Sequence, residues 1–100
     1  MVVDVAEEAQ VDDAIAATLA EHGKVDCLVA NAGIGGGGPF VEQTLEGWRR
    51  AMAVNLDGAF LCFRAAVRHM VDRGDGGSLI GISSTSAIHG APANQAYSCS

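Results

Sequence analysis

Residues 25–33 of the sequence read VDCLVANAG, an apolar run that ends in Asn31, Ala32 and Gly33. A run that is apolar almost throughout, rather than at alternate positions, is typical of a strand buried on both faces. Such strands belong to parallel sheets, in which helices cover the faces. This stretch therefore predicts an α/β fold with a turn of small residues at the carboxyl end of the strand.

The segments around this strand alternate between helical and extended patterns. Apolar residues recur at helical spacing over 8–22, and Gly23 follows where a left-handed cap is usually needed. Residues 1–5 and 78–83 have the composition of two further short, buried strands. Strand, helix, strand, helix and strand with short loops predict right-handed crossovers and a parallel sheet with helices on its faces. The expected fold is α/β, with about three strands and two to three helices.

A long helix is predicted from an N-cap at Thr44 to about Asp72, and the glycines from Gly74 onward end it. Its polar residues form one narrow stripe, and the rest of its circumference is apolar. A helix buried this broadly is expected to pack on the sheet and on another helix, which a second subunit could supply. A further helix is predicted from about Asn94.

Composition and charge exclude several classes of protein. Six Lys and Arg against twelve Asp and Glu give a net charge of −6, which argues against a nucleic-acid binder. No apolar run approaches the roughly 18–20 residues of a membrane span, and no secretion signal opens the chain. The three cysteines form no C-x-x-C pair, and the three histidines are scattered, so neither a disulfide framework nor a metal site is expected. We therefore expect a soluble, cytoplasmic domain.

Polar and small residues follow the predicted strands, where parallel sheets bind their ligands. These strand ends are Asp4-Val5, Asn31-Ala32-Gly33 and Ser83-Ser84. Ala32 and Gly33 would let the backbone approach a ligand closely, and the Asn31 amide could bond to neighbouring strand ends. A plain turn after a strand is the alternative interpretation of this tripeptide.

Three further side chains are candidates for chemistry. Asn55 lies on the apolar side of the long helix, where a buried amide needs partners, so it is either a bridge within the core or part of a site. Ser84 and Tyr97 are thirteen residues apart, and hydroxyl groups that converge could polarise a carbonyl and pass a proton. A tyrosine has an ordinary pKa of about 10 and needs a nearby cation for this role, but no Lys or Arg follows Arg73. Surface or capping roles are the alternative for this pair.

The glycine run at 33–39 (GIGGGGP) cannot form regular structure. Gly33, Gly35 and Gly38 satisfy the G-x-G-x-x-G pattern of dinucleotide-binding turns, but consecutive glycines do so by composition alone. No acidic residue ends a strand about twenty residues later, as that fingerprint requires. A P-loop is excluded because no Lys-Ser/Thr pair follows the glycines. We interpret the run as a flexible loop.

Taken together, the motifs resemble the middle of a short-chain dehydrogenase/reductase, a Rossmann-fold family of NAD(P)-dependent oxidoreductases. The matching residues are Asp4-Val5, Asn31-Ala32-Gly33, Val54-Asn55-Leu56-Asp57-Gly58, Ile82-Ser83-Ser84 and Tyr97-Ser98-Cys99-Ser100. The similarity covers the whole chain, in family order and at family spacing. It implies an incomplete NAD(P)-binding Rossmann domain over 1–100, and hydride transfer between NAD or NADP and a small-molecule carbonyl or secondary alcohol.

The resemblance implies catalytic roles for three residues. Tyr97 would be the acid/base and would also touch the cofactor, and Ser84 would hold the substrate oxygen. Asn55 would shape the helix and position a water in a proton relay. His89, between Ser84 and Tyr97, is interpreted as an ordinary loop histidine in preference to a substrate contact.

The resemblance also implies contacts to the cofactor at two strand ends. Asp4 and Val5 would flank the adenine, with Asp4 accepting from its amino group. Asn31, Ala32 and Gly33 would support the sheet and border the nicotinamide side. From the residues alone, Asp4 is also a candidate cap for the helix at 8–22, and both roles are compatible.

The family pattern is incomplete in this chain. The lysine that follows the tyrosine motif in the family would come directly after Ser100, and the glycine-rich opening turn is absent with the first two strands. Residues 1–5 are therefore expected to lack a neighbouring strand. We expect an internal fragment of a longer, homo-oligomeric oxidoreductase, inactive by itself. The alternative is a non-catalytic piece that acts at most as an interaction segment through its long apolar helix.

Overall fold

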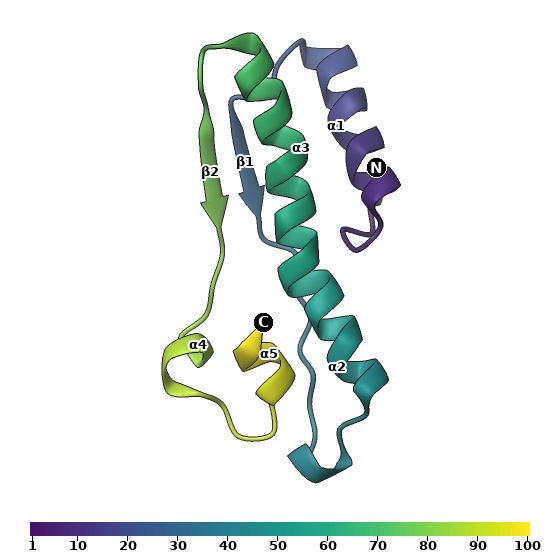
Figure 1. Ribbon diagram of the computed structural model, residues 1–100, viewed down its shortest axis with the longest axis vertical. Helices are drawn as coiled ribbons and strands as arrows, with labels where there is room; N and C mark the ends of the chain where they lie inside the picture. The colour runs from purple at the N-terminus through teal and green to yellow at the C-terminus, as the bar shows by residue number, and fades with distance from the viewer.

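The computed structural model describes residues 1–100 and contains one parallel sheet of two strands (Figure 1). Strand β1 (Cys27–Ala30) pairs with β2 (Ser78–Gly81), in a register that sets Cys27 opposite Ser78 and Ala30 opposite Gly81. The chain between these strands contains the long helix that packs on β1. The predicted α/β fold with a parallel crossover is confirmed.

The long helices lie where the sequence predicts them. They are α1 (Glu8–His22) and a continuous rod made of α2 (Leu45–Met52), the π-helical segment η2 (Ala53–Asp57) and α3 (Gly58–Arg73). Thr44 is the N-cap of the rod, because its Oγ1 accepts from the Gly47 N–H at 3.0 Å. Gly23 (φ 77°) and Gly74 (φ 82°) end α1 and α3 in the left-handed conformation that favours glycine.

Three short elements complete the chain. The 3₁₀ turn η1 (Phe40–Glu42) precedes α2, and α4 (Ser86–His89) and α5 (Gln95–Cys99) follow β2. The helix predicted from about Asn94 is α5. The structure has more helices than the two to three predicted, because α4 forms between β2 and the helix predicted from about Asn94.

Residues 1–5 do not form the predicted first strand, so the sheet has two strands instead of three. Backbone groups of a strand need a neighbouring strand, and none lies beside this segment. Its contacts are with the helices instead: the Asp4 N–H donates to Gln10 Oε1 on α1 at 2.9 Å. Val5 packs on the rod at Gly58, where an added Cβ would lie only 2.7 Å from Val5 Cγ2.

The core lies between the sheet and the two long helices. Val25, Ala66 and Met70 are buried there, with Leu19 and Leu28 packed against them. The opposite face of the sheet is open, since Val29 is 53% exposed and Ile80 is 45% exposed. The sequence led us to expect helices on both faces, and the structure covers one.

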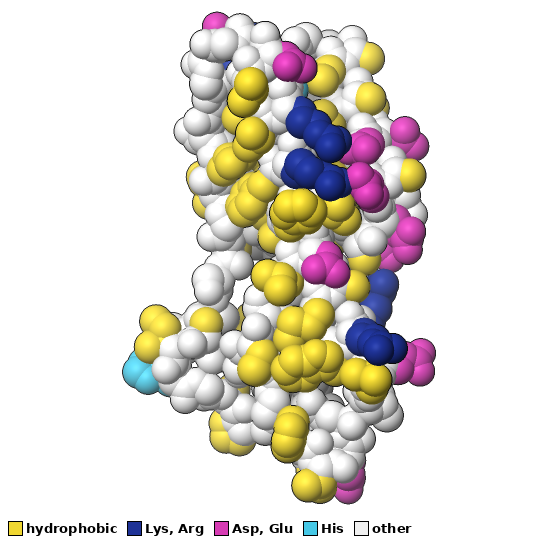
Figure 2. Space-filling view, viewed as in Figure 1, with side chains coloured by type: hydrophobic (Ala, Val, Ile, Leu, Met, Phe, Trp, Pro, Cys, Tyr) yellow, Lys and Arg dark blue, Asp and Glu magenta, His cyan; other side chains and the backbone are white.

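Much of the rod is also exposed. Leu56, Phe60, Val67 and Val71 all have more than a third of their surface in solvent. Figure 2 shows hydrophobic side chains spread along this face, next to a group where basic and acidic side chains meet. Arg64 on α3 forms an ion pair with Glu8 on α1. No helix combines the length and the hydropathy needed to cross a bilayer.

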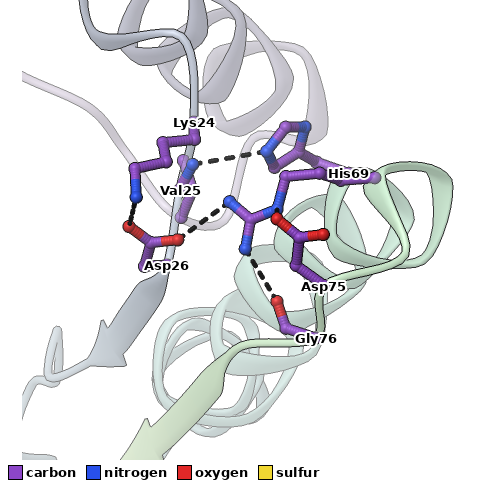
Figure 3. Close-up of polar contacts among 7 residues, drawn as sticks. Lys24, Val25, Asp26, His69, Asp75 and Gly76 are labelled. Atoms are coloured by element: carbon purple, nitrogen blue, oxygen red, sulfur yellow. Dashed lines mark hydrogen bonds and ion pairs between the residues drawn. The ribbon is translucent and has the colours of Figure 1, made fainter.

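Polar contacts join the start of β1 to the end of α3 (Figure 3). The Val25 N–H donates to His69 Nε2 at 3.3 Å. Asp26 pairs with Lys24 and with Arg73, each at 2.8 Å. Lys24, together with Arg73, holds the pKa of Asp26 below its usual range. These contacts fix the start of β1 against the helix that covers it.

Candidate active site

A cleft of about 490 Å³ opens beyond the carboxyl ends of the two strands, beside η2 and α5. This is where parallel sheets bind ligands. The predicted site residues that line it are Asn31, Ala32, Gly33, Asn55, Ser84 and Tyr97. The fold therefore brings six of the eight predicted site residues to one cavity.

Asn55 lies in the π-helical segment η2, and its side chain makes three hydrogen bonds. Oδ1 accepts from the Ile34 N–H at 2.8 Å, and Nδ2 donates to the Ile34 carbonyl at 2.9 Å and to Ser100 Oγ at 2.7 Å. Both N–H groups of the amide are used, so the donors of this half-buried side chain are satisfied. A π-helical turn inside an α-helix is frequently found at functional sites. Asn55 thus connects the rod, the loop after β1 and the end of α5.

The two hydroxyl groups reach the cleft from different elements. Ser84 follows β2, and its Oγ accepts from the Ser86 N–H at 3.2 Å. The Ser84 O–H is therefore available as a donor toward the cleft. Tyr97 lies on α5, half-buried, and its carbonyl accepts from Ser100 Oγ at 2.9 Å. A donor hydroxyl and a phenol thus both line the cavity.

The turn after β1 presents its backbone to the cleft. Asn31, Ala32 and Gly33 are exposed, and the last two have little or no side chain to cover the peptide groups. Gly33 lies close to the rod, because an added Cβ would be 3.5 Å from Asn55 Oδ1. This turn is thus positioned by Asn55 on one side and is open on the other.

Asp4 and Val5 lie beside the cleft. Val5 lines an adjoining cavity of about 60 Å³, which also contacts Asn31 and Ala32. Asp4 Oδ1 accepts from the Ala6 N–H at 3.0 Å, and Oδ2 accepts from Arg50 at 3.3 Å. The Ala6 amide, with Arg50, holds the pKa of Asp4 below its usual range. Asp4 does not cap α1: the N-cap residue is Glu7, and it makes no side-chain bond to the helix.

Other candidates lie outside the cleft. His89 is exposed at the end of α4 and does not line the cavity. The glycine run forms neither helix nor strand, as predicted. Cys62 lines the small cavity next to Val5, and burial raises the pKa of its thiol.

The sequence analysis did not predict that Ile34 and Ser100 are the hydrogen-bond partners of Asn55 in the site. Ile34 acts through its backbone N–H and carbonyl, which every residue type except proline offers, so no composition signal marks it. The Ser100 hydroxyl accepts a hydrogen bond from Asn55 Nδ2 and donates one to the Tyr97 carbonyl. The approach of a serine at 100 to an asparagine at 55 depends on the fold and is invisible along the chain.

Comparisons with a family model and with individual proteins agree on one family. The family model described as short chain dehydrogenase matches residues 1–100. A short-chain dehydrogenase/reductase of Hericium erinaceus is 42% identical over 97 residues, which are 97% of this chain and 38% of that protein. An NAD-dependent oxidoreductase of Mycobacterium tuberculosis is 37% identical over 98 residues, which are 98% of this chain and 36% of that protein.

A solved structure agrees with these sequences. A gluconate 5-dehydrogenase from Burkholderia cenocepacia, crystallised with NADP and tartrate, superposes with a TM-score of 0.87 at 41% identity. The match covers 96% of this chain and 37% of that chain. The present chain therefore spans 36–38% of the length of these relatives.

Proposed function

Because the chain belongs to the short-chain dehydrogenase family, we propose that residues 1–100 are part of the NAD(P)-binding Rossmann domain of an oxidoreductase. The protein would transfer a hydride between NAD or NADP and a small carbonyl or secondary alcohol. The observation that carries this proposal is the single cleft shared by Asn55, Ser84 and Tyr97. The NAD-dependent relative and the NADP-bound neighbour support the choice of cofactor.

The residues at the strand ends suit such a cofactor. Ala32 and Gly33 expose their backbone to the cleft, so a flat ring could approach it closely, with Asn31 at its edge. Asp4 and Val5 would flank the adenine, and the Asp4 carboxylate, whose pKa lies below its usual range, would accept from the adenine amino group. When bound, the nicotinamide supplies or accepts the hydride.

The hydroxyl groups of the chain would handle the substrate oxygen. Ser84 would donate a hydrogen bond to that oxygen, because its Oγ already accepts from the Ser86 N–H and its own proton is free. Tyr97 would donate a proton to the same oxygen when a carbonyl is reduced, and would take it back when an alcohol is oxidised. Asn55 would keep the loop at Ile34 and the end of α5 in place. A relay water at Asn55 would be held by the second lone pair of Oδ1, since both Nδ2 protons are used.

The test uses the natural polypeptide that contains this sequence, with NADH and NADPH and a panel of carbonyls. Tyr97→Phe should lower kcat by about 10²–10⁴-fold, and Ser84→Ala by about 10²–10³-fold. Ser98→Ala is the matched control on α5, because its Oγ is buried without a partner and lies outside the cleft. No turnover of any carbonyl by the unmodified protein, or an undiminished rate in Tyr97→Phe, would contradict the proposal.

The exposed side of the rod favours a second candidate, an interaction segment that pairs with another copy of the chain. Leu56 is 53% exposed, Phe60 57% and Val71 70%, which is a large apolar surface for a monomer. Calorimetry with NADPH and sedimentation of residues 1–100 distinguish the two candidates. Cofactor binding favours the oxidoreductase domain, and self-association without cofactor binding favours the interaction segment.

A further inference from the structure

The four glycines at 35–38 have no part in the proposed reaction, but they are bonded to the segment that leads into α5. The Gly38 N–H donates to the Ala93 carbonyl at 3.0 Å. The Gly36 N–H donates to Asn94 Oδ1 at 3.2 Å. The loop is therefore attached to the residues that come directly before the helix of Tyr97.

Glycine is favoured at two positions of this loop. An added Cβ at Gly36 would lie 3.2 Å from the Cβ of Ala96, which is tighter than ordinary contact, and Ala96 is only 1% exposed. Gly38 has φ +114°, a conformation that residues with a Cβ rarely adopt. The glycines thus let the loop backbone lie directly against α5. This contact accounts for the glycines of a loop that we interpreted, from the sequence alone, as flexible.

The partner segment has an unusual backbone of its own. Ala93 has φ +55°, and it is the one non-glycine residue of the chain with a positive φ. Such a conformation is disfavoured and persists only where the surroundings hold it. Here the Ala93 carbonyl accepts from Gly38, and the next side chain, Asn94, accepts from Gly36. The strain occurs at the point where the two segments meet.

Helix α5 depends on contacts outside itself. It has five residues, far fewer than an isolated helix needs for stability. Its N-cap residue, Asn94, makes no side-chain bond to the helix and contacts Gly36 instead. Just beyond its other end, the Ser100 hydroxyl accepts from Asn55 Nδ2 at 2.7 Å. Tyr97 lies between these two attachments.

We propose that residues 35–38 and 93–95 form a clasp that sets the position of Tyr97 in the cleft, with Asn94 as its positioning residue. A side-chain contact to the clasp residue Gln95, whose Oε1 accepts from Gln43 Nε2 at 3.1 Å, supports the same arrangement. The catalytic meaning of the clasp rests on the proposed function, in which Tyr97 transfers a proton. A reacting group displaced by about 1 Å can cost about a hundredfold in rate, so loss of the clasp should reduce turnover.

The experiment compares Asn94→Ala with Asn94→Asp in the natural polypeptide. Alanine removes the acceptor for the Gly36 N–H, whereas aspartate retains it. We expect Asn94→Ala to lower kcat by about ten- to a hundredfold, with KM changed less than about threefold, and Asn94→Asp to restore most of kcat. Glu42→Gln is the control, because Glu42 is exposed just beyond the glycine loop and outside the cleft.

A second readout needs no turnover. In protein labelled with ¹³C-tyrosine and ¹⁵N-glycine, the Tyr97 ring signal, identified by its loss in Tyr97→Phe, should move together with the Gly36 amide in Asn94→Ala. Both should stay in place in Glu42→Gln. An unmoved Tyr97 signal together with an unchanged kcat in Asn94→Ala would overturn the clasp. If the unmodified protein reduces no carbonyl, the proposed function fails, and the Tyr97 signal alone decides the clasp.

Discussion

The two ends of this molecule are held together by different forces. At the sheet end, α1, α3 and β1 pack around the buried side chains of Val25, Ala66 and Met70. At the cleft end, the side-chain amides of Asn55 and Asn94 hold the glycine loop: each accepts a hydrogen bond from a backbone N–H of the loop, and Asn55 also donates to the Ile34 carbonyl. The first end is a small apolar core, and the second is a set of directional polar contacts (Figure 1).

This difference separates stability from site geometry. Apolar burial is non-directional and contributes roughly in proportion to its area, so the sheet end should supply most of the resistance to unfolding. A hydrogen bond adds little net stability but requires defined distances and angles. The cleft end should therefore control where the reacting groups lie. Three predictions test this separation, from the largest expected effect to the smallest.

Met70→Ala should give the largest loss of stability, about 2–5 kcal/mol, because it leaves a cavity in the core at the sheet end. Met70 is 6% exposed, whereas the neighbouring Val71 is 70% exposed. Val71→Ala is therefore the control, and its effect should stay within about 0.5 kcal/mol. Urea denaturation followed by circular dichroism measures both. Equal losses in the two variants would show that the packing around Met70 is not what stabilises the sheet end.

Asn55→Ala should cost less stability, about 1–3 kcal/mol, because the Ile34 N–H and carbonyl lose their partners. Its effect on turnover should be larger than its effect on folding, since Asn55 also holds the end of α5 through Ser100. Unfolding midpoints and steady-state rates, measured on the same samples, separate the two effects. Normal turnover in a strongly destabilised Asn55→Ala variant would contradict this separation, because the cleft end would then contribute to stability and not to the position of the reacting groups.

Low pH should slightly reduce the free energy of unfolding, through one carboxylate at each end of the molecule. Asp26, beside Lys24 and Arg73, and Asp4, bonded by the Ala6 amide and Arg50, both have a pKa below the ordinary value. A pKa lowered in the folded state contributes stability that is present above the unfolded pKa of about 3.9 and is lost as the pH falls through the folded pKa.

Asp26→Asn and Asp4→Asn should each make the loss of unfolding free energy between about pH 5 and pH 2 less steep. Because both carboxylates are well exposed, screening by water keeps these effects small. Unfolding measured across this pH range tests them, with Asp13→Asn on the exposed side of α1 as the control. A steeper acid limb in either variant would contradict the assigned direction.

Prediction from sequence worked best for features encoded over a few residues. The cap at Thr44, the end of α1 at Gly23 and the extent of the rod depend on local spacing, and the structure confirms all three. The strand expected at residues 1–5 failed, because a strand depends on a neighbour that the segment cannot supply from within itself. The candidate site residues were predicted from motifs, and six of them line one cleft in the structure.

The sequence by itself thus determined the fold class, the boundaries of the two long helices and the residue types at the strand ends, since periodicity and caps act over short distances along the chain. Only the tertiary structure decided how the cleft is held. The contacts of Asn55 with Ile34 and of Asn94 with Gly36 join residues 21 and 58 positions apart. In both contacts the partner of the asparagine is a backbone group, which every residue type except proline can offer. The sequence therefore does not indicate these partners, and only the folded structure shows them.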